Sequence, residues 1–161
     1  MRLVGSGAIL REAIAAQALL ADDWQIDAEV WSATSYSELE REARELEREA
    51  RLQPKKKARR SHVARCLDGE APIVAASDSV RAWPLSIAPH VQARFVALGT
   101  DGFGRSDTRD ALRRFFEVDR HHIALAALDA LAAQGTIERS TCAQAIKRYE
   151  IDVGPLPPWS R

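Results

Sequence analysis

Residues 95–109 read FVALGTDGFGRSDTR and contain the clearest structural signal in the chain. Phe95–Leu98 is a short, fully apolar run of the kind that forms a parallel strand buried on both faces. A glycine-rich turn, Gly99–Arg109, follows it. A helix with Leu112 and Phe115 on its apolar face comes next, and we expect Asp107 to be its N-cap. This order of strand, turn and helix predicts a unit of an α/β fold.

The same order of elements recurs towards the N-terminus. Leu3 and Val4 lead into Gly5-Ser6-Gly7, and a helical apolar pattern then runs from Ile9 to Trp24. Residues 26–31 alternate between apolar and polar types as a strand does, and Ile73–Ala76 is a second apolar strand. Alternation of strands and helices predicts a mostly parallel sheet with helices on both faces. Because the first strand is so short, we expect Met1 to lie at or just inside a domain boundary.

The remaining segments predict helices and connections within one domain over residues 1–161. Ser35 and Glu38 form a capping box that starts a charged helix, which ends near Leu52. A helix from about Ser79 is interrupted by Pro84, and a later helix begins at Asp119 and has Gly135 at its C′ position. Residues 53–61 form a basic linker, and residues 152–161 form a proline-rich tail without regular structure.

Composition narrows the class of protein. Lys and Arg together number 23, as do Asp and Glu, so a dedicated nucleic-acid binder with a basic excess is not expected. Cys66 and Cys142 form no C-x-x-C pair and indicate no disulfide scaffold. No apolar run approaches the ~20 residues that span a bilayer, and we expect a cytoplasmic protein with no membrane partner.

Three local patterns suggest ligand sites, and each has a feature against it. Gly5-Ser6-Gly7 begins like a dinucleotide fingerprint, but Leu10 stands where the third small residue belongs. GTDGFGRS resembles a phosphate-binding loop, but Asp101 would repel phosphate and Arg105 replaces the lysine. His121-His122 cannot bind one metal from one helix face, because adjacent residues point about 100° apart. We therefore expect no catalytic, cofactor-binding or metal-binding residue in this chain.

The Gly99–Arg109 loop is instead predicted to be a rigid interface element. It lies at the carboxyl end of a strand, where open α/β sheets place their binding surfaces. We expect Gly102 and Gly104 to use positive φ, and Phe103 to anchor into the core or into a neighbouring domain. The interface residues predicted are Asp101, Gly102, Phe103, Gly104, Arg105, Ser106, Asp107 and Arg109, with Arg105 or Arg109 pairing with Asp101 or Asp107.

Four stretches resemble one known family. They are LVGSGAILREAIAA (3–16), DAEVWSATSYSEL (27–39), LGTDGFGRSDTRDALRRFFEVDRHHIALAALDALAAQGTI (98–137) and IDVGPLPPW (151–159). They resemble the C-terminal domain of the homodimeric, bacterial-type pyruvate dehydrogenase, the decarboxylating component of that complex. The resemblance implies a transketolase C-terminal-like fold: three layers, with a mostly parallel five-stranded sheet that includes one antiparallel strand. Glu150 departs from the family, which has glycine at this helix C′ position.

The resemblance also implies a role within a larger enzyme. In the family, thiamine diphosphate and Mg²⁺ bind between two preceding domains, through a G-D-G…N motif that this asparagine-free chain lacks. The domain would then help to build the dimer, with the remaining domains, a homodimer mate and the dihydrolipoyl acyltransferase as partners. The chain alone is expected to be inactive. The alternative is a stand-alone binding module that uses the Gly99–Arg109 loop for a protein partner or a small anion.

Overall fold

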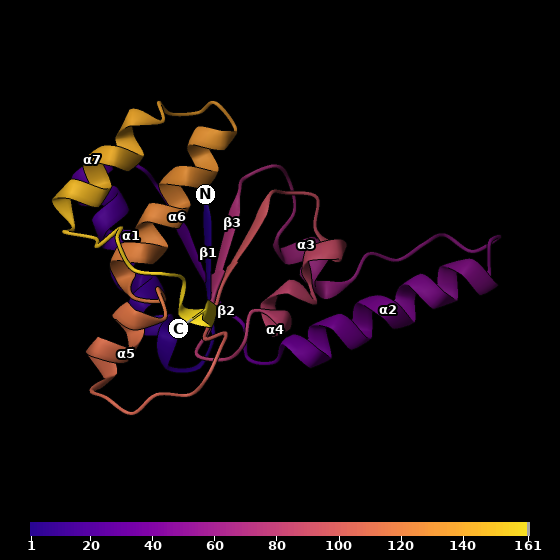
Figure 1. Cartoon of the computed structure of the whole chain (residues 1–161). Coiled ribbons are helices and arrows are strands. Elements are labelled where there is room, and N and C mark those ends of the chain that lie inside the picture. Colours follow the sequence, from indigo (N-terminus) through magenta and orange to yellow (C-terminus); the bar gives the residue numbers. More distant parts are fainter. Residues whose placement is uncertain (161) are drawn as a thin grey trace.

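The structure is a computed structural model that describes residues 1–160. A parallel sheet lies at its centre, with the strand order β2-β1-β3-β4 (Figure 1). The strands are β1 (Arg2–Gly5), β2 (Glu29–Ser32), β3 (Ile73–Ala76) and β4 (Phe95–Leu98). The chain leaves β1 in one direction to reach β2 and returns past it to reach β3. The strand order therefore reverses between β1 and β3.

Alternation along the two central strands produces the two cores. Leu3 and Val74 point into one core, while Val4 and Ile73, their neighbours in sequence, point into the other. All four residues of β3 are 0% exposed, which explains why its sequence is apolar throughout rather than alternating.

One face of the sheet is covered by helices from both ends of the chain. α1 (Leu10–Trp24) packs beside α6 (Arg120–Ala133), and α6 also contacts α7 (Ser140–Arg148). α5 (Arg109–Phe115) connects β4 to this layer, and a 3-10 turn, η1 (Gly7–Ile9), leads into α1. α6 is apolar on most of its faces because it contacts α1, α7 and the strands β3 and β4.

The other face carries shorter helices and one long one. α3 (His62–Cys66) and α4 (Ala82–Leu85) lie near the sheet, and α2 (Tyr36–Leu52) contacts both of them at its N-terminal part and then projects from the body (Figure 1). Residues 53–61 connect α2 to α3 without helix or strand. Exposed ion pairs at helical spacing, such as Arg41 with Glu38 and Glu45, lie along this helix.

Several expectations need correction. The sheet has four strands, not five, and no antiparallel strand occurs in residues 1–160. The tail that follows α7 contains Pro155, Pro157 and Pro158, which lack the N–H that a ladder strand donates. Its last turn is 3-10, η3 (Pro158–Ser160), although no regular structure is expected there.

Two element boundaries also differ from the expectation. β2 starts at Glu29 rather than at residue 26, because its partner strand begins only at Arg2, which pairs with Glu29. The segment after residue 79 is not one helix with a break. It forms the single turn α4 and a separate 3-10 turn, η2 (Ala88–His90), since Pro84 and Pro89 each lack a helical N–H. Among the described residues, no helix is long and apolar enough to cross a membrane.

Candidate interface site

The Gly99–Arg109 loop is fastened to the segment that follows β3. Thr100 donates its backbone N–H to Ser79 O at 3.0 Å. Asp101 Oδ1 accepts the backbone N–H of Arg81 at 2.9 Å, and Asp101 Oδ2 pairs with the Arg81 guanidinium. Burial raises the pKa of Asp101, but the hydrogen bonds and charge of Arg81 outweigh it and hold that pKa below the ordinary value. Asp101 is thus ionised and structural.

The middle of the loop lies against the end of the chain. Gly102 has φ +104°, and a Cβ placed on it would be 3.0 Å from Trp159 Cα and 3.1 Å from Pro158 O. The Arg81 guanidinium lies over the Trp159 ring, 4.6 Å from its centroid. Arg81 therefore joins the loop to the tail, through an ion pair on one side and a cation–π contact on the other.

Phe103 points into solvent. Its side chain is 85% exposed, and Leu156 and Trp159 of the adjoining tail are 65% and 52% exposed. We call these three residues the Phe103 surface. The expectation that Phe103 anchors in the core of this domain is therefore wrong, and the alternative, an anchor in a neighbouring domain, stays a prediction. Aromatic side chains, Phe among them, are enriched at the cores of protein interfaces.

The polar residues of the loop differ in part from the expectation. Thr108, not Asp107, is the N-cap of α5: its Oγ1 accepts the N–H of Ala111 at 3.3 Å, while Asp107 only accepts the N–H of Thr108. Arg105 makes no ion pair with an aspartate and lies 4.8 Å from the centroid of the Phe115 ring. The reason is that Arg81, distant in sequence, already pairs with Asp101.

The other loop positions are exposed. Gly104 does not have a positive φ, contrary to expectation, and a Cβ there would meet nothing within 4 Å. Ser106 is exposed, and Arg109 is the exposed first residue of α5. Residues 100–102 therefore hold the contacts that fasten the loop, and residues 103–109 are exposed.

The histidine pair has a structural role. His122 Nδ1 lies 2.8 Å from Asp119 Oδ1, and the same carboxylate caps α6. His121 stacks on Tyr149 at a centroid distance of 5.0 Å. No group of three or more His, Cys, Asp or Glu in the described residues could hold a metal ion.

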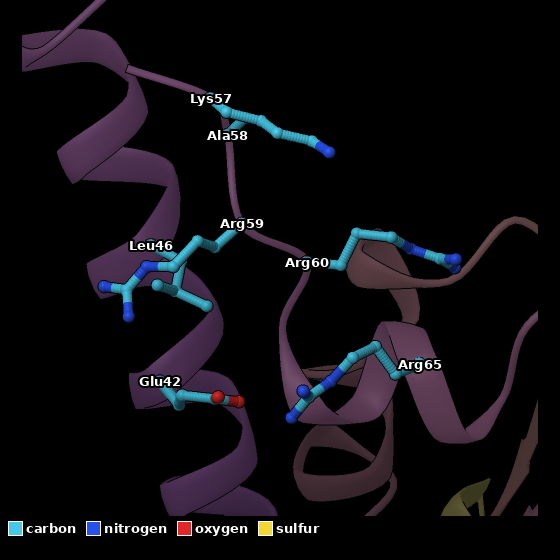
Figure 2. Close-up of a pocket in the computed structure, with 7 residues that line it drawn as sticks. All are labelled: Glu42, Leu46, Lys57, Ala58, Arg59, Arg60 and Arg65. Carbon is cyan, nitrogen blue, oxygen red and sulfur yellow. The ribbon is translucent and has the colours of Figure 1, made fainter.

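A basic hollow lies between α2 and the linker (Figure 2). Two of its four basic residues are in ion pairs: Arg59 pairs with Glu49, and Arg60 points away from the hollow to pair with Asp68. Glu42 adds a carboxylate to the wall and accepts the backbone N–H of His62 at 2.7 Å. This mixture of charges does not form an anion site.

Together, the strand order and the two helical layers define an open, parallel α/β domain with a loop-and-tail surface at the carboxyl ends of its strands. Residues 1–119 match the family described as the transketolase-like TK C-terminal domain. The chain belongs to this family, as its sequence motifs predict.

Relatives extend the similarity over nearly the whole chain. It is 49% identical over 161 residues to the pyruvate dehydrogenase E1 component of Cupriavidus necator, covering 99% of this chain and 18% of the relative. The similarly named proteins of Pseudomonas aeruginosa and Escherichia coli K12 are 47% and 38% identical, covering 94% and 98% of this chain and 18% of each relative. The chain thus spans less than a fifth of these relatives.

One solved structure supports the fold. It is described as a split gene transketolase, an inactive beta4 tetramer, and it matches with a TM-score of 0.55 at 20% identity. The match covers 81% of this chain and 39% of that one.

Arg81, Pro158 and Trp159 belong to the site and are missed by sequence reasoning. Nothing local to Arg81 marks it as the partner of Asp101, 20 residues away. The positive φ of Gly102 could be predicted from the sequence. The tail that lies beside Gly102 and leaves no room for a side chain could not, because it is a tertiary contact.

Proposed function

We propose that this chain acts as the transketolase-like C-terminal domain of a pyruvate dehydrogenase E1 component, and that it docks through the Phe103 surface. The identity to E1 components over almost the entire chain supports the assignment. The observation that carries the docking role is the exposure of Phe103 on a loop whose base Arg81 fastens. The rest of the enzyme and a homodimer mate are the partners proposed, with the dihydrolipoyl acyltransferase as the acceptor of the acetyl group, in the cytoplasm.

The residues present do not fit thiamine diphosphate or Mg²⁺. Asp101 is already paired with Arg81. The described residues offer no cluster of side chains that could hold a metal ion. The carboxylate of Asp101 also adds a negative charge to the loop, which opposes a phosphate there. In this proposal the cofactor belongs to other domains of the enzyme, and this domain contributes to assembly.

A chimera tests the proposal. The matching segment of the Cupriavidus necator protein would be replaced by this chain, and pyruvate decarboxylation and subunit association would be measured. We expect the chimera to be active, and Phe103→Ser to weaken its assembly at least tenfold. Leu52→Ser is the matched control, because Leu52 is 61% exposed at the far end of α2.

The outcomes separate the two parts of the proposal. A folded but inactive chimera would contradict the assignment to an E1 component. An active chimera that assembles equally well with Phe103→Ser would leave the assignment standing and remove the Phe103 surface from the interface.

A further inference from the structure

A cleft, separate from the basic hollow beside α2, opens between β1 and β3, where the strand order reverses. Ser6 directly follows β1 and Ser77 directly follows β3, and the two hydroxyls are 2.9 Å apart. In open α/β sheets, ligands bind outside the carboxyl ends of the strands at this reversal. The cleft has a volume of about 540 Å³ and extends from Gly7 to the start of α2 and to α4. It is separate from the loop tip that carries Phe103.

Hydroxyl groups dominate the wall of the cleft. The hydroxyl-bearing residues are Ser6, Ser32, Thr34, Ser35, Tyr36, Ser37, Ser77 and Ser79. Some are committed: Ser77 Oγ accepts the N–H of Ser79, and Ser35 caps α2. The hydroxyls of Ser32, Thr34 and Ser79 have no hydrogen bond with any residue the structure describes. Each hydroxyl can both donate and accept.

Tyr36 contributes a buried polar group whose hydrogen bonding is incomplete. Its side chain is 7% exposed, its hydroxyl makes no hydrogen bond of ordinary geometry with a described residue, and the Ser6 hydroxyl lies beside it. Burial raises the pKa of Tyr36 to about 12, and the neighbouring Ser6 hydroxyl opposes that rise. A buried hydroxyl with incomplete hydrogen bonding costs free energy, so the cleft favours a ligand whose O–H groups extend the contact between Ser6 and Tyr36.

The charge around the cleft opposes phosphate ligands and favours uncharged ones. Among residues 1–160, no Lys, Arg or His lines the cleft, and the Asp78 carboxylate lies 3.1 Å from where a Cβ on Gly7 would be. That carboxylate opposes a phosphate at the start of α1. Trp83, 51% exposed, instead offers a flat apolar ring at the rim. A ring beside many hydroxyls suits a molecule with apolar C–H faces and several O–H groups.

We propose that the cleft binds a small, uncharged, polyhydroxylated molecule of the monosaccharide class. Its O–H groups would exchange hydrogen bonds with Thr34, Ser79 and the Ser6–Ser77 pair, and its C–H face would lie against Trp83. Asp78 would accept a hydrogen bond from the same molecule near Gly7.

Amide chemical shifts of the whole chain test this proposal. Glucose and ribose would be titrated to roughly 50 mM, which would saturate a site with a Kd on the order of 1 mM. Inorganic phosphate would be titrated in parallel. We expect saturable shifts from at least one sugar at Gly7, residues 32–37 and residues 77–79, and none there from phosphate. No shift from either sugar, or a phosphate response in the cleft, would overturn the proposal.

Variants identify the groups involved. Trp83→Ala is expected to weaken sugar binding at least tenfold, and Tyr36→Phe several-fold, because it removes the hydroxyl and keeps the ring. Trp159→Ala is the matched control, because Trp159 is 52% exposed and lies at the Phe103 surface. Unchanged binding in Trp83→Ala, with a well-dispersed spectrum showing that the variant is folded, would also overturn the proposal.

Discussion

Glu150 occupies a backbone position that suits glycine. It has φ 51° after the last turn of α7. The N–H of Ile151 reaches Ile146 O at 3.0 Å, and the N–H of Glu150 reaches Lys147 O at 3.4 Å, which is the Schellman pattern. Gly135 fills the same role after α6, with φ 73°. Glu150 therefore adopts a left-handed conformation that is strained for a residue with a side chain.

Glu150→Gly is expected to stabilise the chain by about 1 kcal/mol, because relief of the left-handed strain exceeds the added freedom of the unfolded state. Urea unfolding would measure it. Glu138→Gly, at an exposed position without a positive φ, is the control and should be destabilising. A loss of stability in both variants would show that Glu150 carries no strain.

Glu12 is a buried carboxylate that sequence patterns do not reveal. It is 3% exposed, and it accepts hydrogen bonds from Arg113 at 2.9 Å and from the backbone and side chain of Arg120 at 3.0 Å. Glu12→Gln leaves two arginines facing a neutral amide, and we expect a loss of about 3 kcal/mol in the free energy of unfolding. The exposed Glu38→Gln should change little.

The effect of Glu12 depends on pH in a defined direction. Burial raises the pKa of Glu12, but the hydrogen bonds from Arg120 and the charges of Arg120 and Arg113 together outweigh this rise. The folded-state pKa therefore lies below the ordinary value of 4.5. Its contribution is therefore complete above pH 4.5 and is lost as the pH falls through the folded-state pKa. Unfolding curves of the wild type and Glu12→Gln should converge in acid. A constant difference down to the acid transition would contradict this assignment.

At the scale of elements, the loop and the tail form one unit around Gly102. Gly102→Ala places a Cβ 3.0 Å from Trp159 Cα at a φ of +104°. We expect a loss of about 2 kcal/mol and increased mobility of the tail in amide relaxation. Gly104→Ala is the paired control, since that position has free space and no positive φ, and its effect should stay within about 0.5 kcal/mol. Equal effects of the two substitutions would mean that the tail does not pack on the loop.

The sequence predicts the elements well where their signals are local. The apolar runs at residues 73–76 and 95–98 become β3 and β4, and Asp119 caps α6 as its position indicates. A fifth strand is expected from family resemblance alone, since no fifth segment has a strand pattern, and the sheet has four strands. The partners of Asp101 and Glu12 could not be predicted, because Arg81, Arg113 and Arg120 meet them only through packing of distant segments.

For the molecule as a whole, exposed apolar side chains occur on the loop and the tail near the carboxyl end of β4. Phe103, Leu156 and Trp159 are exposed, the backbone of Trp159 lies against Gly102, and the Arg81 guanidinium lies over the Trp159 ring. Burial of apolar side chains contributes about 25 cal/mol per Å², so a surface of this kind favours association once a complementary face is present. The homodimer mate of the proposed function would supply a second copy.

We therefore expect this chain to self-associate reversibly as its concentration rises, in sedimentation velocity experiments. Phe103→Ser should shift the association to at least tenfold higher concentration, because Phe103 has the largest exposed fraction of the three side chains. Ile14→Ser, which replaces a half-exposed apolar residue of α1, is the control and should leave the association unchanged. A wild-type chain that remains a monomer at millimolar concentration would contradict the prediction. Association that Ile14→Ser weakens and Phe103→Ser does not would place the contact on the helical face instead.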